Sequence, residues 1–160
     1  MALRGTFNKS KTELAEEIEN MGARYNAHSD REFTSYTFQT FKGDTNKAIN
    51  LLGDMICNSA LNSAELELVK DEVSMEHEDN HNRYSETTLE NVHFNAFREH
   101  MMGQPIMGDR DVTQMIGAEE LRNYQQANYF GDNVVVVATG DVSHDQIVDA
   151  VDQAFASLPK

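Results

Sequence analysis

Two neighbouring strand-forming stretches near the start of the chain constrain the fold more than any other feature. Residues 23–29 form the first stretch, and residues 33–41 are rich in the aromatic and β-branched side chains that favour strands. Only Asp30, Arg31 and Glu32 separate the two stretches. The pair therefore predicts an antiparallel hairpin closed by a charged turn.

Helices are predicted on both sides of this hairpin. The spacing of Leu14, Ile18 and Met21 predicts a helix over 10–21 that ends at Gly22, a residue suited to a helix C-terminus. Similar signals predict helices over about 45–58, 63–81, 84–100, 117–129 and 143–158, a loop over 101–109 and a further strand over 133–139. The predicted fold class is α+β, with an antiparallel sheet covered by helices in a single domain of residues 1–160.

Charge and hydropathy exclude two classes of partner. The formal net charge is −14, which repels phosphate backbones and argues against nucleic-acid binding but suits cationic partners such as basic peptides. The longest apolar run, Val134 to Ala138, is far shorter than a membrane-spanning helix, so no transmembrane segment is predicted. The lone Cys57 cannot form an internal disulfide and is predicted to be a small core residue.

One short motif could bind zinc within this chain. His77-Glu78-Asp79-Asn80-His81 matches H-E-x-x-H, in which two histidines one helical turn apart bind zinc and the glutamate acts as general base. Such a helix normally carries apolar residues around the motif, whereas the residues around His77 and His81 are almost all polar. A solvated helix face is the competing interpretation.

A longer pattern runs through the hairpin region. Glu19-Asn20-Met21-Gly22-Ala23, followed by residues 26–36, resembles the stretch E-N-x-G-A-x-x-N-A-x-T-x-R-E-x-T-x-Y of the pitrilysin-type zinc peptidases. The likeness extends to Gly140-Asp141-Val142 and Leu158-Pro159, and so covers essentially the whole chain. Within the family it is strongest toward the mitochondrial processing peptidases and the related core subunits of respiratory complex III.

The resemblance implies an incomplete domain. The family's catalytic element is H-x-x-E-H, and Met1-Ala2-Leu3-Arg4-Gly5-Thr6 resembles the stretch that follows it. Residues 1–160 are therefore expected to form a partial metallopeptidase domain that lacks its N-terminal strands and its metal-motif helix. No catalytic residue is expected in this chain, and whether its parent protein is an enzyme stays open.

Three residues take an expected role from the resemblance. Glu76 aligns with the family's third zinc ligand, a glutamate on a later helix, so Zn²⁺ is the expected metal of the complete site. Asn26 and Ala27 lie where the family presents an edge strand to an extended substrate peptide. The alternatives are an ordinary surface glutamate and a purely structural strand.

Two functions follow from the resemblance. The first is a part of a zinc metalloendopeptidase that cleaves basic targeting presequences in the mitochondrial matrix, completed by a second polypeptide such as an alpha-type subunit or the missing N-terminal piece. The second is a non-catalytic core subunit of respiratory complex III, at the matrix face of the inner membrane, or of another mitochondrial assembly. Val69 and Gln104 favour the second function, because active family members commonly have glutamate and arginine at those positions.

Overall fold

A two-stranded antiparallel hairpin organises the first third of the chain in this computed structural model, which describes residues 1–80 and 82–159. Strand β1 (Arg24–Ser29) pairs with β2 (Thr34–Gln39) in a register from Arg24↔Gln39 to Ser29↔Thr34. The predicted hairpin is confirmed. Its charged turn is closed by the Asp30 backbone N–H, which donates to the Phe33 carbonyl at 2.8 Å.

The main core lies between this hairpin and two helices. Helix α1 (Lys11–Asn20) begins at Ser10, whose side chain and the carboxylate of Glu13 cap each other's backbone N–H groups, and α2 (Thr45–Cys57) follows the short helix η1 (Lys42–Asp44). Four side chains form the buried cluster, and the inward face of the hairpin packs against it. The buried cluster consists of Leu14, Met21, Leu51 and Met55. Tyr25 and Phe38 of the hairpin are partly buried and pack against it.

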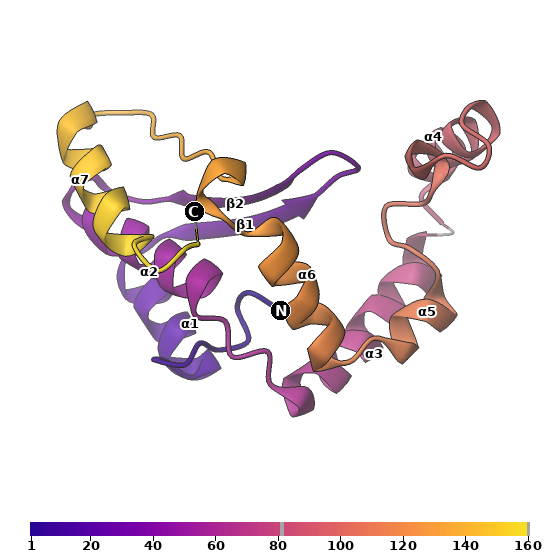
Figure 1. Cartoon of the computed structure of the whole chain (residues 1–160), viewed down its shortest axis with the longest axis horizontal. Helices are drawn as coiled ribbons and strands as arrows, with labels where there is room; N and C mark the ends of the chain where they lie inside the picture. Colours follow the sequence, from indigo (N-terminus) through magenta and orange to yellow (C-terminus); the bar gives the residue numbers. More distant parts are fainter. Residues whose placement is uncertain (81, 160) are drawn as a thin grey trace.

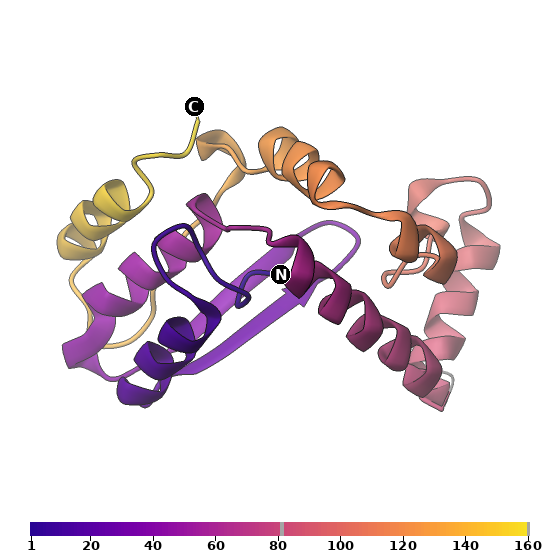
Figure 2. The same ribbon diagram turned by 90° about the horizontal axis from the view of Figure 1, so that it is seen from below.

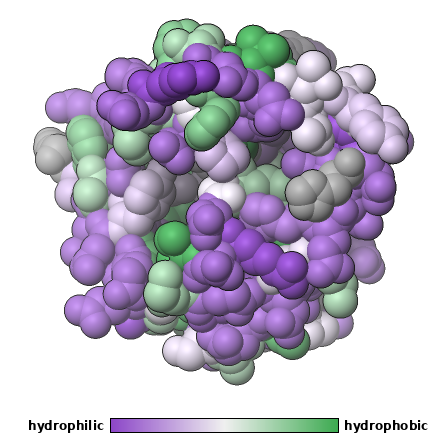
Figure 3. All heavy atoms as spheres, turned by 90° about the vertical axis from the view of Figure 1, so that its right-hand side faces the viewer, coloured by the Kyte–Doolittle hydropathy of each residue, from purple (hydrophilic) through white to green (hydrophobic). Residues whose placement is uncertain are grey.

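The middle of the chain forms an arm that projects from this core (Figures 1 and 2). It comprises α3 (Ser63–Asn80), α4 (Tyr84–Ala96), η2 (Met101–Gly103) and α5 (Arg110–Met115). Arg4 anchors the first half of α3 through ion pairs with Glu65, at 3.3 Å, and with Glu72. On the side of the molecule formed by the arm, the surface is mostly hydrophilic with separate hydrophobic patches (Figure 3).

The last third of the chain returns to the core. Helix α6 (Ala118–Asn128) is followed by η3 (Gly131–Asn133) and α7 (His144–Ala154), and α7 packs on α2. The two helices meet at Gly53, where an added Cβ would lie 2.5 Å from the Ala154 carbonyl oxygen. Gln125 joins α6 to α2 by donating to the Ile56 carbonyl at 2.7 Å.

One predicted element and the ends of two predicted helices differ from the structure. The strand predicted over 133–139 is wrong: residues 134–139 lie in neither strand nor helix, because no other described strand pairs with them. The helix predicted over 84–100 ends at Ala96, and the one predicted over 143–158 ends at Ala154. Helix α5 was not predicted; the Asp109 side chain caps it by accepting from the N–H groups of Asp111 and Val112. Among the described residues, no helix is both long and apolar enough to cross a bilayer.

Candidate peptide-binding site

Strand β1 has one free edge within the described part of the chain. It pairs with β2 alone, so its other edge faces no strand. Asn26 and Ala27 are both exposed at the middle of β1, opposite Thr37 and Tyr36 of β2. A free edge of this kind can add an extended peptide through backbone hydrogen bonds. The role of these two residues in binding such a peptide stays a prediction.

Arg31 fastens the tip of the hairpin to the arm. Its side chain is only 9% exposed, its Nη2 lies 2.7 Å from Glu90 Oε2 on α4, and its Nε donates to the Met102 carbonyl at 3.0 Å. The sequence suggested only a charged turn here. The structure shows instead that the turn joins β1 to α4 and η2, which places a second set of side chains at the end of the free edge.

These side chains form an open pocket of about 340 Å³ at the hairpin tip. Four of the nine lining residues carry a carboxylate, and four others offer apolar or aromatic surface. The lining residues are Asp30, Arg31, Glu32, Glu86, Leu89, Glu90, His93, Met102 and Ile106. A lysine or arginine side chain has the matching shape and charge, with an apolar stem and a cationic head.

The charge of this pocket is only partly neutralised. Arg31 pairs with Glu90, and Arg83 lies 3.4 Å from Glu86 in an exposed ion pair. Asp30 and Glu32 form no ion pair with a described residue. The Asp30 carboxylate accepts a hydrogen bond from the Arg31 backbone N–H at 2.7 Å. The pocket therefore retains a net negative charge for a cationic ligand.

Sequence reasoning missed the acidic residues of this pocket. Glu86 and Glu90 are four residues apart on a predicted helix, so their position on one helix face was readable from the sequence. Their approach to Asp30 and Glu32, more than fifty residues earlier, depends on how the arm meets the hairpin. No local pattern encodes that contact.

The candidate zinc ligand Glu76 lies exposed on α3. Its carboxylate makes no hydrogen bond or ion pair with a described residue. No three potential metal-ligating side chains gather anywhere within residues 1–80 and 82–159. The role of Glu76 as one ligand of a zinc site therefore stays a prediction.

The alternative motif on the same helix is only partly described. His77 is half-buried, its Nε2 is buried without a hydrogen-bond partner among the described residues, and Glu78 lies 3.3 Å from Arg110 in an exposed ion pair. His81 lies outside the described residues. The zinc site proposed at His77 and His81 is therefore not tested by the structure.

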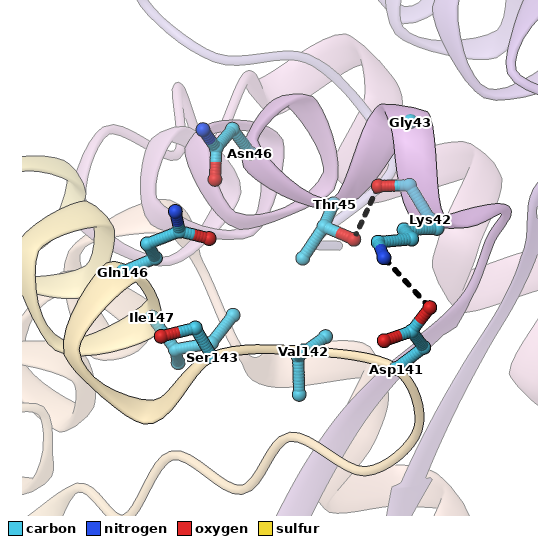
Figure 4. Close-up of a pocket in the computed structure, with 9 residues that line it drawn as sticks. All are labelled: Lys42, Gly43, Thr45, Asn46, Asp141, Val142, Ser143, Gln146 and Ile147. Carbon is cyan, nitrogen blue, oxygen red and sulfur yellow. Dashed lines mark hydrogen bonds and ion pairs between the residues drawn. The ribbon is translucent and has the colours of Figure 1, made fainter.

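A second pocket of about 130 Å³ lies between the starts of α2 and α7 (Figure 4). Lys42 is the cation among its described lining residues, and its Nζ lies 2.6 Å from Asp141 Oδ2. Because Asp141 neutralises this lysine, the pocket offers a ligand no net positive charge. The pocket at the hairpin tip remains the stronger candidate.

Comparison with known proteins identifies the family. Residues 1–110 match the sequence profile described as Insulinase (Peptidase family M16). The chain belongs to peptidase family M16. Residues 116–160 match a second profile of this family, described as Peptidase M16 inactive domain. The resemblance to pitrilysin-type peptidases seen in the sequence is thereby confirmed.

Two relatives show how much of an M16 protein the chain represents. It is 34% identical over 159 residues to the mitochondrial-processing peptidase subunit beta of Neurospora crassa, which covers 99% of this chain and 33% of the relative. It is 34% identical over 149 residues to the human subunit of the same name, covering 93% of this chain and 30% of the relative. The chain thus spans about a third of the length of these relatives.

Solved structures confirm the fold class. A structure titled as a peptidase M16 inactive domain from Pseudomonas fluorescens superposes with a TM-score of 0.88 at 18% identity, covering the whole of this chain and 39% of the other. A protease from Helicobacter pylori gives a TM-score of 0.83 at 20% identity, covering 99% of this chain and 38% of the other. The arrangement of hairpin, core helices and arm is therefore an M16 fold.

Proposed function

We propose that this chain forms the substrate-binding part of an M16 zinc metallopeptidase and holds extended, basic peptides along β1. The observation that carries the proposal is the continuity between the free edge of β1 and the acidic pocket. β1 ends at Ser29, and the next three residues line the pocket. A peptide paired with β1 would pass directly over these carboxylates.

The chemistry of the pocket selects the side chain. Backbone pairing with β1 is independent of sequence, so specificity must come from the side chains of the bound peptide. A lysine or arginine would lay its stem against Leu89 and Ile106 and bring its charge near Glu86 and Asp30. The net charge of −14 would also draw basic peptides toward the chain.

The finer identity of the substrate rests on the named relatives. The Neurospora crassa and human relatives are called mitochondrial-processing peptidase subunit beta. This supports basic presequences as substrates, the mitochondrial matrix as the location and an alpha-type subunit as a partner of the parent protein. Because the chain spans about a third of these relatives, each of these assignments concerns the complete protein.

Glu76 would contribute one carboxylate to the zinc site of that protein. When bound, zinc supplies an activated water for hydrolysis of the peptide bond. This chain's own contributions would be the carboxylate of Glu76 on α3, the backbone of β1 that orients the peptide, and the acidic pocket that sets its register.

Fluorescence anisotropy with a labelled arginine-containing peptide tests the binding proposal. Replacing the two carboxylates proposed to hold the bound charge, Asp30→Asn with Glu86→Gln, should weaken binding about tenfold, because two partly exposed charge interactions are worth about 1–2 kcal/mol together. The matched control Glu16→Gln with Glu19→Gln changes the net charge equally on the exposed face of α1. Equal weakening in both double variants would show that only the overall charge matters and would refute the proposal.

Val69 and Gln104 favour a second candidate, a non-catalytic core subunit of respiratory complex III or another mitochondrial assembly. Val69 is half-buried on α3, two helical turns before Glu76, where it offers no polar group to support a ligand. Zinc analysis of the intact complex purified from its source separates the two candidates. One zinc per copy that is lost in Glu76→Gln supports the peptidase, and a complex without zinc supports the structural subunit.

A further inference from the structure

A cation of the chain itself already occupies one side of the acidic pocket at the hairpin tip. The Arg31 side chain is only 9% exposed, and its Nη2 lies 2.7 Å from Glu90 Oε2, whose side chain is 25% exposed. In the ion pair between Arg83 and Glu86, by contrast, both side chains are more than half exposed. Water and salt screen a shielded pair much less than an exposed one. The charge of Glu90 is therefore neutralised before any ligand binds.

Hydrogen bonds hold Arg31 in this position. Its Nε donates to the Met102 carbonyl at 3.0 Å, and its backbone N–H donates to Asp30 Oδ1 at 2.7 Å. The hairpin tip that carries Arg31 points toward the arm in Figures 1 and 2. Because a guanidinium is planar and presents its N–H groups in a fixed fork, partners at both Nε and Nη2 fix its orientation. A ligand cation can reach Glu90 directly only by displacing Arg31 from both partners.

The carboxylates of the pocket consequently fall into two groups. Glu90 is paired with Arg31. Within the described part of the chain, Asp30 and Glu32 form no ion pair, and Glu86 forms only an exposed one. Glu86 and Glu90 are neighbours on one face of α4, with Cβ atoms about 5–6 Å apart. One ligand cation can thus lie beside Glu86, whereas a second cation near Glu90 would meet the positive charge of Arg31 at short range.

We infer that Arg31 is a specificity-determining residue, which limits this pocket to one basic side chain of the bound peptide. Arg31 takes up the charge of Glu90 and repels a second cation. In an extended peptide, alternate side chains point to the same side, so the rule applies to basic residues two positions apart. This inference rests on the proposed function and adds to it a substrate class, peptides in which the basic residue is isolated.

Arg31 also joins the hairpin to the arm, and its charge can be separated from that structural role. Replacement by lysine and replacement by methionine both remove the guanidinium fork that spans Glu90 and Met102. Lysine and methionine are both unbranched, and lysine alone keeps the positive charge. A purely structural role predicts the same result for both variants, whereas the inferred role predicts different results.

Fluorescence anisotropy of the whole chain with three labelled peptides tests the inference. Each peptide is built of valine and threonine and differs only at its centre, which is Arg-Thr-Arg, Arg-Thr-citrulline or citrulline-Thr-citrulline. Citrulline has nearly the shape of arginine without its charge. The quantity measured is the ratio of the dissociation constants of the second and first peptides, which reports the gain from a second basic residue.

This ratio should depend on the charge at position 31. It should be below about threefold in the wild type and in Arg31→Lys. In Arg31→Met it should be about fivefold larger than in the wild type, because Glu90 becomes available for one further charge interaction.

The double variant Arg31→Met with Glu90→Gln is the matched control. It removes both charges of the pair, so the pocket keeps the net charge of the wild type. The ratio should return to the wild-type value, because no carboxylate is left for the second cation at that position. Replacing both members of a shielded ion pair by neutral side chains is often tolerated, so this variant gives a reading even where Arg31→Met alone is unstable.

Three results would overturn the inference: a ratio unchanged in Arg31→Met, a ratio that rises equally in Arg31→Lys, and a ratio that stays high in the double variant. The third peptide separates this failure from failure of the proposed function. A wild-type chain that binds the citrulline-Thr-citrulline peptide as tightly as the Arg-Thr-citrulline peptide refutes binding of a basic side chain altogether. A wild-type chain that prefers arginine, with no effect of Arg31→Met on the ratio, refutes the role of Arg31 alone.

Discussion

Replacing Gly53 with alanine tests the packing that holds the last third of the chain on the core. A Cβ at Gly53 would lie 2.5 Å from the carbonyl oxygen of Ala154 and 2.9 Å from its carbonyl carbon and Cβ. Ordinary contacts between such atoms are about 3.5 Å, so α2 and α7 must separate by about 1 Å. Backbone atoms of a helix cannot move aside as a flexible side chain would.

The expected cost follows from two opposing effects. Overpacking of this kind destabilises proteins by about 1–3 kcal/mol, and a contact with backbone belongs at the upper end of that range. Alanine stabilises the interior of α2 by about 1 kcal/mol relative to glycine. The net loss of unfolding free energy is therefore about 2 kcal/mol, which lowers the melting temperature by about 4–8 °C in a chain of this size.

Thermal unfolding followed by circular dichroism measures this effect. Gly43→Ala is the matched control, because an added Cβ at Gly43 has no atom within 4 Å. Its melting temperature should stay close to that of the wild type. A Gly53→Ala variant as stable as the control, or more stable, would refute the close approach of α2 and α7.

Two further predictions concern individual titratable groups. Burial raises the pKa of Asp54, but hydrogen bonds from Thr6, Asn58 and Asn8 outweigh it and hold the pKa below its ordinary value. The ionised Asp54 therefore stabilises the fold above about pH 4, and this stabilisation is lost as the pH falls through the folded pKa of Asp54. In Asp54→Asn, the free energy of unfolding measured in urea should fall less steeply between neutral and acidic pH than in the wild type. Burial raises the pKa of the Cys57 thiol, although a hydrogen bond from Ser157 opposes it. Cys57 should thus react more slowly with an aromatic disulfide reagent at pH 8 in the folded chain than in urea, and equal rates would contradict its partial burial.

Local patterns predicted the elements whose determinants are close in sequence. The apolar spacing of Leu14 and Met21 and the cap at Ser10 define α1, and the β-rich stretches on either side of Arg31 define the hairpin. Composition alone predicts a strand over residues 133–139, but a strand exists only when another strand pairs with it. The strand prediction is therefore wrong because no described strand pairs with these residues.

The candidate site was less predictable than the fold. The sequence indicated Asn26 and Ala27 through a family pattern, and the structure places them on a free edge. It did not indicate that Arg31 joins the hairpin to α4, because that contact bridges 59 positions of sequence. Acidic side chains that are ordinary surface residues in the sequence become a pocket only through this tertiary contact.

Paramagnetic relaxation NMR tests the central claim most directly. A basic, extended peptide with a nitroxide at one end is added to the isotope-labelled chain, and signal loss is mapped along the sequence. If the peptide lies along β1, signals should broaden in β1 (24–29), at the hairpin tip (30–32) and along α4 near Glu86 and Glu90, and they should recover when the spin label is reduced. Broadening centred elsewhere, or none at saturating peptide, would contradict peptide binding at this site.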